Sequence, residues 1–326
     1  MIIASETMTH PKPRPKVQPD TYVRRRENPG VTSIMSVTAR EIASQPAIWR
    51  HALEQVDLAT ELLVRPGERM LVIGCGTSAF VAESFAALRE GAGYGMTDGG
   101  YASEPRVWRD YDRVLAITRS GTTSEVIEAI RSLPAGVPVT VVTGVADSPV
   151  AELATDILLL DFADEESVVQ TRFPTSFLIL ARAAFGEDVD GLPAEAEQAL
   201  AEDFDLDVSR LDHFVYLGSG WTYGLAQEAA LKIREAAQAW SESYPLLDYR
   251  HGPVSVAHPS SLVWMIGRSE EALAEEVRLT GATVIVGTHD PLVELVLAQR
   301  LAVAVATSRG LNPDTPRYLT RSIVLK

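Results

Sequence analysis

The chain has 326 residues, a length that favours two domains of roughly 150 residues each over one large domain. Its hydrophobic content of 46% with 22% charged residues is typical of a folded globular protein. The formal net charge of -15 argues against nucleic acid and anionic membranes as partners, because both would repel the chain. Cys75 is the only cysteine, which excludes an internal disulfide and favours a reducing, cytoplasmic compartment.

Residues 1–34 are rich in basic residues and prolines, with no apolar stretch behind them. They do not match a secretory signal, and we expect either a disordered tail or an upstream, mis-assigned start. The longest apolar runs further along, such as 260–266 and 303–306, are far shorter than the roughly 20 residues that a membrane span needs. We therefore expect no transmembrane helix.

Two lead-in helices are expected over 38–63, interrupted at Pro46. From Arg69 on, short apolar runs alternate with glycine turns and helices, which indicates βα units and a parallel sheet. The strands expected in this half cover 70–74, 113–118, 139–144 and 157–161, and its helices begin at Ser78, Thr123 and Ser148. An acidic, alanine-rich helix over 192–207 then links to the second half.

The second half of the chain repeats the first. Residues 213–233 match 69–88 as strand, glycine turn and helix, and residues 261–277 match 113–130. A further strand is expected over 281–288. A repeat of this length indicates duplicated domains rather than a solenoid of short units.

The predicted fold is therefore α/β, with two tandem domains that each have a parallel sheet covered by helices on both faces. This is the three-layer, flavodoxin-like arrangement. The first domain covers 35–195 and the second covers 196–326.

The first candidate site is the glycine turn GCGTSA over 74–79, between a strand and a helix. Glycines let the backbone approach a ligand closely, and the free amides at a helix start favour an anion. Thr77 and Ser78 add hydroxyl donors. A dinucleotide site fits the same pattern, but no acidic residue clearly ends a second strand about 20 residues on. The alternative is a tight turn with a purely structural role and no ligand.

The second candidate is TRSGTTS over 118–124, which follows a strand and begins a helix. Four of its residues carry hydroxyls that can bind a phosphate without a lysine or a metal: Thr118, Ser120, Thr122 and Thr123. The loop lacks the GK[ST] ending of a nucleotide-hydrolysing P-loop. Helix capping is the alternative, although capping needs one hydroxyl rather than four. The corresponding loop of the second half is acidic, so we expect one anion site.

The third candidate is the helix predicted over 225–244. Glu228, Lys232 and Glu235 share one stripe of it, and by itself such a stripe is usually a solvated, salt-bridged face. Glu242 would lie one helical step further on, and His251 follows in a Gly-Pro turn. A carboxylate, an amine and an imidazole in one short stretch suit aldose-ketose isomerisation, which needs a base and a ring-opening group.

The other histidines lack such a setting: His10, His51, His213, His258 and His289. The HxxxH and HExxH spacings of metal sites are absent, so we expect neither a metal nor another cofactor.

Seven motifs, in order, resemble the enzymes with two sugar-isomerase (SIS) domains. They are CGTS (75–78), ASEPR (102–106), RSGTTSE (119–125), DEESVVQTR (164–172), EAALKIRE (228–235), HGP (251–253) and PRYLTRSIVL (316–325). That family includes the isomerase half of glucosamine-6-phosphate synthase, sugar-phosphate deaminases and isomerases of the tagatose and galactosamine type, and fructoselysine-6-phosphate deglycases. The resemblance covers 35–326 and implies two tandem SIS domains.

The resemblance also implies roles for single residues. The family's phosphate ligands fall on Ser78, Thr118, Ser120 and Thr123, next to Thr77 and to Arg119, whose position is often a glutamine. Sugar hydroxyl contacts fall on Glu165 and the backbone near Val168, with Gln170 in place of a serine. The proton-transferring glutamate falls on Glu235 and the ring-opening histidine on His251, with Glu228 and Lys232 in support.

Arg321 stands where the family pattern has a lysine near the C-terminus. Arginine cannot readily lose a proton or form an imine, so a lysine's chemistry does not transfer to this position. In the family, the histidine reaches into the site of the neighbouring subunit, which implies a homodimer with shared active sites.

The resemblance leaves the reaction on the sugar phosphate open between isomerisation, deamination and removal of an amine adduct. A sugar-phosphate sensor without catalysis is a second class of function, but a sensor needs only the phosphate loop and not Glu235 or His251. A Rossmann dehydrogenase is a third class, and it would require nicotinamide.

Overall fold

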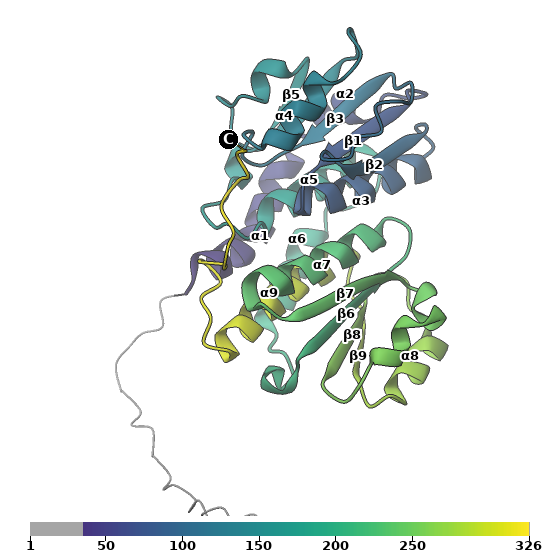
Figure 1. The fold of residues 1–326 in the computed structure, drawn as a ribbon, viewed down its shortest axis with the longest axis vertical. Helices are drawn as coiled ribbons and strands as arrows, with labels where there is room; N and C mark the ends of the chain where they lie inside the picture. Colours follow the sequence, from purple (N-terminus) through teal and green to yellow (C-terminus); the bar gives the residue numbers. More distant parts are fainter. Residues whose placement is uncertain (1–34, 326) are drawn as a thin grey trace, which may run out of the picture. The chain divides into compact units, whose positions relative to one another are not determined.

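The computed structural model describes residues 35–325, so the tail expected over 1–34 lies outside the described residues. Within this range the chain forms two parallel β-sheets with helices packed against them (Figure 1). The predicted α/β class is thereby confirmed. The described residues belong to one compact unit, and the boundary expected between 195 and 196 stays a prediction.

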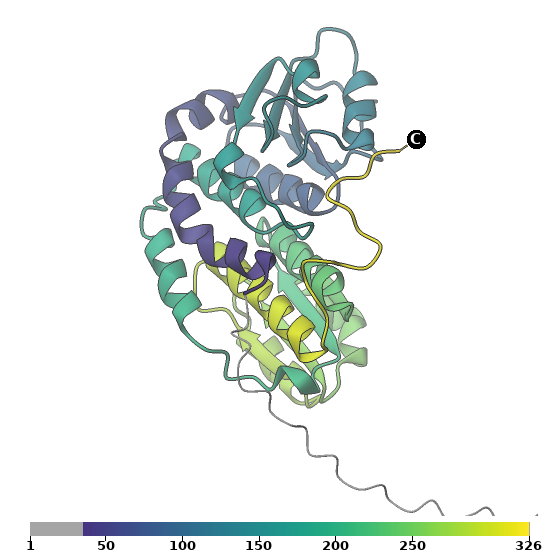
Figure 2. The ribbon, with the colours of Figure 1, turned by 90° about the vertical axis from the view of Figure 1, so that its left-hand side faces the viewer.

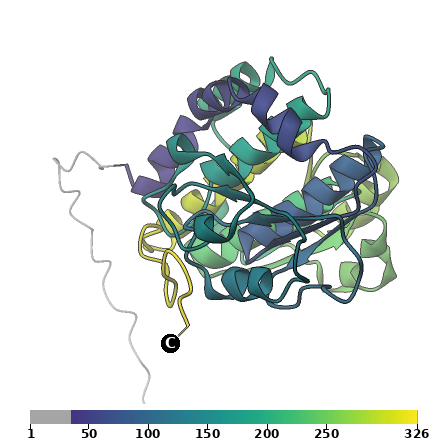
Figure 3. The same cartoon turned by 90° about the horizontal axis from the view of Figure 1, so that it is seen from above.

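The first sheet has five strands in the order β2-β1-β3-β4-β5. Its strands are β1 (Met70–Gly74), β2 (Thr97–Tyr101), β3 (Arg113–Ile117), β4 (Val139–Thr143) and β5 (Asp156–Leu159). The helices of this half are α1 (Val37–Leu53), α2 (Val56–Leu63), α3 (Thr77–Gly91), α4 (Ser124–Arg131) and α5 (Arg172–Ala184). Figure 3 shows α1 and α2, in purple, along one side of the molecule. The central strands are buried throughout, which explains their continuous apolar sequences.

The second sheet has four strands in the order β7-β6-β8-β9, which repeats the order β2-β1-β3-β4 of the first. Its strands are β6 (His213–Gly218), β7 (Trp240–Pro245), β8 (Ser261–Met265) and β9 (Thr283–Val286). The helices of this half are α6 (Leu192–Ala201), α7 (Thr222–Ala237), α8 (Glu271–Arg278) and α9 (Pro291–Ser308). The internal repeat read from the sequence therefore corresponds to a repeated strand order.

The largest hydrophobic cluster lies between the two sheets and takes side chains from both halves. Helices α3 and α7 pack together there, and their closest approach is at Gly224. A Cβ atom on Gly224 would lie 2.2 Å from Ser84 Oγ and 2.4 Å from the Phe80 carbonyl oxygen. Only glycine allows this approach, which brings the start of α3 next to α7.

Four details differ from the sequence-based expectation. Helix α1 continues through Pro46, because the Gln45 side chain donates to the Ile42 carbonyl that a backbone amide at position 46 would have bonded. No α-helix begins at Ser148, where only a short 3-10 turn follows, and the linking helix ends at Ala201. Helices α5 and α9 were not expected.

The helix expected to reach 244 ends at Ala237, because Gln238 adopts a left-handed conformation with φ 49°. The chain then extends as β7 along the edge of the second sheet. Glu242 consequently lies on a strand, away from the stripe of α7. The two edge strands β2 and β7 were missed because they carry polar residues and glycines instead of an apolar run.

Among the described residues, α9 is the one helix with the length and hydropathy to cross a membrane. Its 18-residue window is 67% buried inside the structure, where it packs mainly on α7. This core packing accounts for its apolar sequence.

Candidate functional site

The hydroxyl-rich loop of 118–124 connects β3 to α4 at the carboxyl edge of the first sheet, where α/β folds bind ligands. Gly121 has φ +67°, and a Cβ atom there would lie 2.2 Å from Ser148 Oγ. Thr118 and Ser120 are buried, and Thr118 Oγ1 has no hydrogen-bond partner within residues 35–325. Thr123 precedes α4 but its hydroxyl makes no capping bond, so capping does not explain its presence.

The glycine turn of 74–79 connects β1 to α3, next to the hydroxyl-rich loop, because β1 and β3 are neighbours. A Cβ atom on Gly74 would lie 2.5 Å from Ser78 Cβ, so glycine is required for the tight turn. Thr77 and Ser78 are buried in the first turn of α3. The two loops therefore present their hydroxyls and helix N-termini at one edge of the sheet.

Helix α7 carries the predicted stripe into the interface between the two halves. The Lys232 ammonium lies 3.1 Å from Glu228 Oε1 and 2.6 Å from Glu235 Oε2. Thr77 of the first half completes the network, since its hydroxyl accepts from Lys232 at 3.0 Å and donates to Glu228 at 3.2 Å. The alternative prediction for this stripe, a solvated salt-bridged face, is wrong for Glu228 and Lys232, because each is only 1% exposed. Glu235 remains partly open, with 18% of its side chain exposed.

Burial raises the pKa of Glu228 to about 7; Lys232 opposes this shift and the Glu235 carboxylate adds to it. Burial alone would lower the pKa of Lys232, but the two neighbouring carboxylates outweigh it and the pKa ends above its ordinary value. Lys232 is therefore a charged ammonium near neutral pH. Glu228 changes its charge in the same pH range.

We expect Glu228 to make folding stability pH-dependent. Its folded pKa is raised, so its contribution is fully present below pH 4.5 and is lost as the pH rises through about 7. Between pH 5 and pH 8 the wild type should lose on the order of 2 kcal/mol of unfolding free energy relative to Glu228→Gln. Urea denaturation of both proteins at several pH values measures this difference. A difference independent of pH would contradict the raised pKa.

The loop of 164–172 brings Glu165 beneath the hydroxyl-rich loop. One Glu165 oxygen accepts from the Thr171 amide at 2.5 Å, the Thr171 hydroxyl at 2.7 Å and the Arg172 amide at 2.8 Å, at the start of α5. The other oxygen, Oε2, lies 3.8 Å from Arg119 Nη1. Burial raises the pKa of Glu165, against the opposing charge of Arg119. Val168 and Gln170 on the same loop are partly buried.

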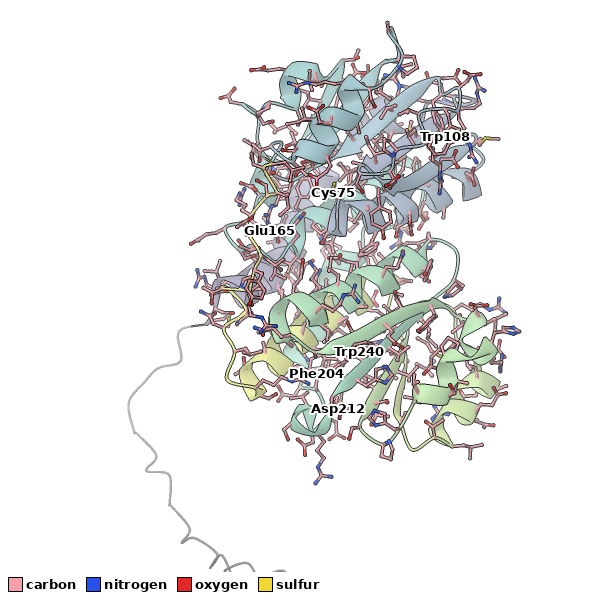
Figure 4. All side chains as sticks on the ribbon, in the orientation of Figure 1. Cys75, Trp108, Glu165, Phe204, Asp212 and Trp240 are labelled. Atoms are coloured by element: carbon pink, nitrogen blue, oxygen red, sulfur yellow. The ribbon has the colours of Figure 1, made fainter. Side chains whose placement is uncertain are left out.

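Arg119 and Arg321 join this loop to the C-terminal segment. Arg119 donates to the carbonyl oxygens of Ser167 at 2.8 Å and Arg321 at 2.9 Å. Arg321 in turn pairs with both oxygens of Asp164, at 2.5 and 2.7 Å, and donates to the Glu165 carbonyl. Figure 4 shows Glu165 beside the yellow C-terminal segment.

His251 is exposed at the end of a 3-10 turn, Asp248–His251, that follows β7. Among the described residues, no hydrogen bond links the His251 ring to the network on α7. One chain thus brings Thr77, Glu228, Lys232 and Glu235 together but leaves His251 on the surface.

Several buried oxygens of the predicted site residues have no hydrogen-bond partner within residues 35–325. They are Thr118 Oγ1, Glu165 Oε2, Gln170 Oε1, Glu228 Oε2 and Glu235 Oε2, the last of which is ion-paired with Lys232. An unpaired buried oxygen is costly, and all five belong to groups that can accept hydrogen bonds. Such atoms are suited to a ligand that supplies hydroxyl or amine donors.

Two further features of this region concern metals and cavities. No group of three or more potential metal ligands occurs among residues 35–325. A cavity of about 340 Å³ lies on the outer side of α4, bordered by the ASEPR segment and by Leu325. The predicted site residues do not line this cavity.

Sequence reasoning gave no role to two acidic residues that shape the site. Glu41 of α1 accepts from the amides of Glu166 at 2.6 Å and Ser167 at 3.3 Å, and so holds the loop of 164–172. Nothing in the local pattern of α1 marks it. Asp164 is the first residue of the motif over 164–172. Its negative charge, which could pair with the positive charge of Arg321, was the one signal for its role in the sequence.

Comparison with known proteins identifies the first half. Residues 63–185 match the SIS domain family. This segment is therefore similar to a SIS domain. The glycine turn, the hydroxyl-rich loop and the loop of 164–172 all lie within this segment, while α7 lies beyond the matched segment.

Curated relatives match both halves of the chain. A glutamine–fructose-6-phosphate aminotransferase (isomerizing) from Sulfurisphaera tokodaii is 24% identical over 88% of this chain and 56% of its own length. The corresponding enzyme of Methanothermobacter thermautotrophicus is 27% identical over 88% of this chain and 57% of its own length. The chain thus spans a little more than half the length of these relatives.

Solved structures share the fold around this segment. Glucosamine-6-phosphate deaminase from Thermotoga maritima has a TM-score of 0.78 and 27% identity, covering 89% of this chain and 100% of its own. Tagatose-6-phosphate ketose/aldose isomerase from Escherichia coli has a TM-score of 0.75 and 21% identity, covering 92% of this chain and 99% of its own.

Proposed function

We propose that this chain is a phosphosugar isomerase or deaminase that acts on a hexose or amino-sugar 6-phosphate with its own acid and base groups. The observation that carries the proposal is the bonding of Thr77 to both Glu228 and Lys232. It joins α7, which carries the partly open Glu235, to Thr77 of the glycine turn, one of the turns proposed to bind an anion. A deaminase and an isomerase of sugar phosphates share this fold, which supports the same reaction class.

The geometry suggests how the proton moves. Glu235 is held at 2.6 Å by the charged Lys232, and a carboxylate fixed in this way can carry a proton between adjacent sugar carbons. Lys232 is in turn held by Glu228 and Thr77. His251 is proposed to open the sugar ring. The phosphate is proposed to bind to the hydroxyls and amides of Ser78, Thr118, Ser120 and Thr123.

The second half is proposed to be a second SIS domain, which the repeated strand order supports. Because His251 is exposed, we further propose a homodimer in which His251 completes the partner's site. A cytoplasmic location without nucleic acid or membrane partners remains a prediction from composition and charge.

A fructoselysine-type deglycase and a non-catalytic sugar-phosphate sensor are the alternatives. The buried network on α7 favours an enzyme, because a sensor needs only the phosphate loop. A screen of the 6-phosphates of fructose, glucosamine, galactosamine, tagatose and glycated amino acids decides between them, with sugar products and ammonia measured separately. Binding without any turnover would identify a sensor.

We expect phosphorylated sugars, and not their unphosphorylated forms, to stabilise the protein against heat. A ligand at about a hundred times its Kd adds about 2.7 kcal/mol to the unfolding free energy. Ser120→Ala with Thr123→Val should abolish that gain because both hydroxyls belong to the proposed phosphate site. Ser269→Ala, in the corresponding loop of the second half, is the control and should keep it. An unchanged melting shift in the double variant would place the phosphate elsewhere.

A further inference from the structure

Arg119 is the second residue of the hydroxyl-rich loop, yet its guanidinium is almost completely buried, with 1% of the side chain exposed. Its two terminal nitrogens each donate to a main-chain carbonyl from a different segment. Nη1 bonds Ser167 in the loop of 164–172, and Nη2 bonds Arg321 in the C-terminal segment. One side chain therefore connects three stretches that are far apart in sequence.

The C-terminal segment of 309–325 contains no helix or strand, so individual contacts hold it in place. At its start, the Asp314 carboxylate accepts from the Val37 and Thr38 amides at the beginning of α1, at 2.8 and 2.9 Å. From there it runs from the second half up to the first (Figure 2).

At its far end, the segment lies against the hydroxyl-rich loop itself. The Ser322 hydroxyl accepts from Thr122 at 2.9 Å, and the Ser124 amide donates to the Ile323 carbonyl at 3.1 Å. The Leu325 amide donates to the Ser124 hydroxyl at 2.9 Å. Any loosening of the segment thus reaches the residues that are proposed to bind phosphate.

An arginine is well suited to this position. A planar guanidinium can direct two N–H groups at two carbonyls at once, whereas a lysine or a glutamine cannot hold both in the same geometry. Glu165 Oε2, 3.8 Å away, compensates the buried charge. The guanidinium is thereby committed to main-chain oxygens, with only Nε left without a partner within residues 35–325.

We propose that Arg119 is a positioning residue that fastens the C-terminal segment and the loop of 164–172 to the hydroxyl-rich loop. Without this link the C-terminal segment would be held only by its remaining bonds, those of Arg321 to Asp164 and Glu165 and those of residues 322–325 to the hydroxyl-rich loop. The hydroxyls of Ser120 and Thr122 would then be held less firmly. The consequence for ligand binding rests on the proposed function, whereas the consequence for the segment's mobility does not.

Hydrogen exchange followed by mass spectrometry tests the link in the protein without ligand. In Arg119→Gln, exchange at the hydrogen-bonded amides of 317–325, those of Leu319 and Leu325, should become at least tenfold faster. Arg119→Lys should fall between this variant and the wild type. Arg182→Gln is the matched control, because Arg182 is also buried and paired, with Asp290 and Glu187, but does not touch the C-terminal segment. The control should leave exchange at 317–325 unchanged. If Arg119→Gln does not fold, the comparison uses Arg119→Lys.

Calorimetry with glucosamine 6-phosphate and fructose 6-phosphate tests the effect on binding. Arg119→Gln and Arg321→Gln should each raise the Kd at least tenfold. The Kd of the double variant should rise by less than the product of the two single fold increases, because both residues act through the same segment. Multiplicative effects, or weaker binding with unchanged exchange at 317–325, would make Arg119 a direct phosphate ligand and overturn the proposal. Faster exchange with unchanged affinity would also overturn it. If the wild type binds neither sugar, the proposed function fails, while the exchange measurement still decides the link.

Discussion

Glu235→Gln is expected to lower turnover at least about a hundredfold while sugar-phosphate binding stays within a few-fold, because it removes a general base and keeps its shape. Glutamine can still accept a hydrogen bond from Lys232, which lies 2.6 Å from the carboxylate. The phosphate contacts are made by other residues. Steady-state kinetics and calorimetry with the substrate found by the screen separate the two quantities.

Glu242→Gln is the matched control for this prediction. Glu242 is a carboxylate of the same half, but it bonds Trp240 and Tyr244 on β7 and lies outside the network of α7. Its replacement should leave turnover within a few-fold of the wild type. If Glu235→Gln behaves in the same way, Glu235 is only a helix residue that pairs with Lys232.

Mixing inactive Glu235→Gln and inactive His251→Ala proteins should restore activity, because each proposed site takes its glutamate from one subunit and its histidine from the other. In a heterodimer, one site carries both defects and the other carries both wild-type groups. With free exchange of subunits, half of the dimers are heterodimers, so about a quarter of the wild-type activity should return. The exposed position of His251, apart from the α7 network, is the structural reason for this expectation.

Subunit exchange has to be shown separately, by pull-down of an untagged variant with a tagged one. Each variant mixed with wild type provides the reference for dimers with a single defect. If heterodimers form and no activity returns, His251 serves its own chain or has no catalytic role. A chain that stays monomeric at assay concentrations would exclude the shared site altogether.

Local sequence patterns were sufficient for the central part of the fold. Strands β1, β3 and β4 are buried on both faces, so their apolar runs stood out between glycine turns. The edge strands β2 and β7 could not be read in this way, because they form mainly by pairing with β1 and β6. The end of α7 was misjudged for the same reason, since β7 begins within the expected helix.

The sequence by itself determined which chemical groups are present and on which segments. The hydroxyls of 118–124 follow a strand, and Glu228, Lys232 and Glu235 share one stripe of a helix, as the residue spacing predicted. The tertiary structure alone decided which of these groups meet. Thr77 joins Lys232 where Gly224 lets α3 and α7 approach closely, and Arg119 donates to two carbonyls that are distant in sequence. Such contacts depend on packing between segments, for which local periodicity carries no signal.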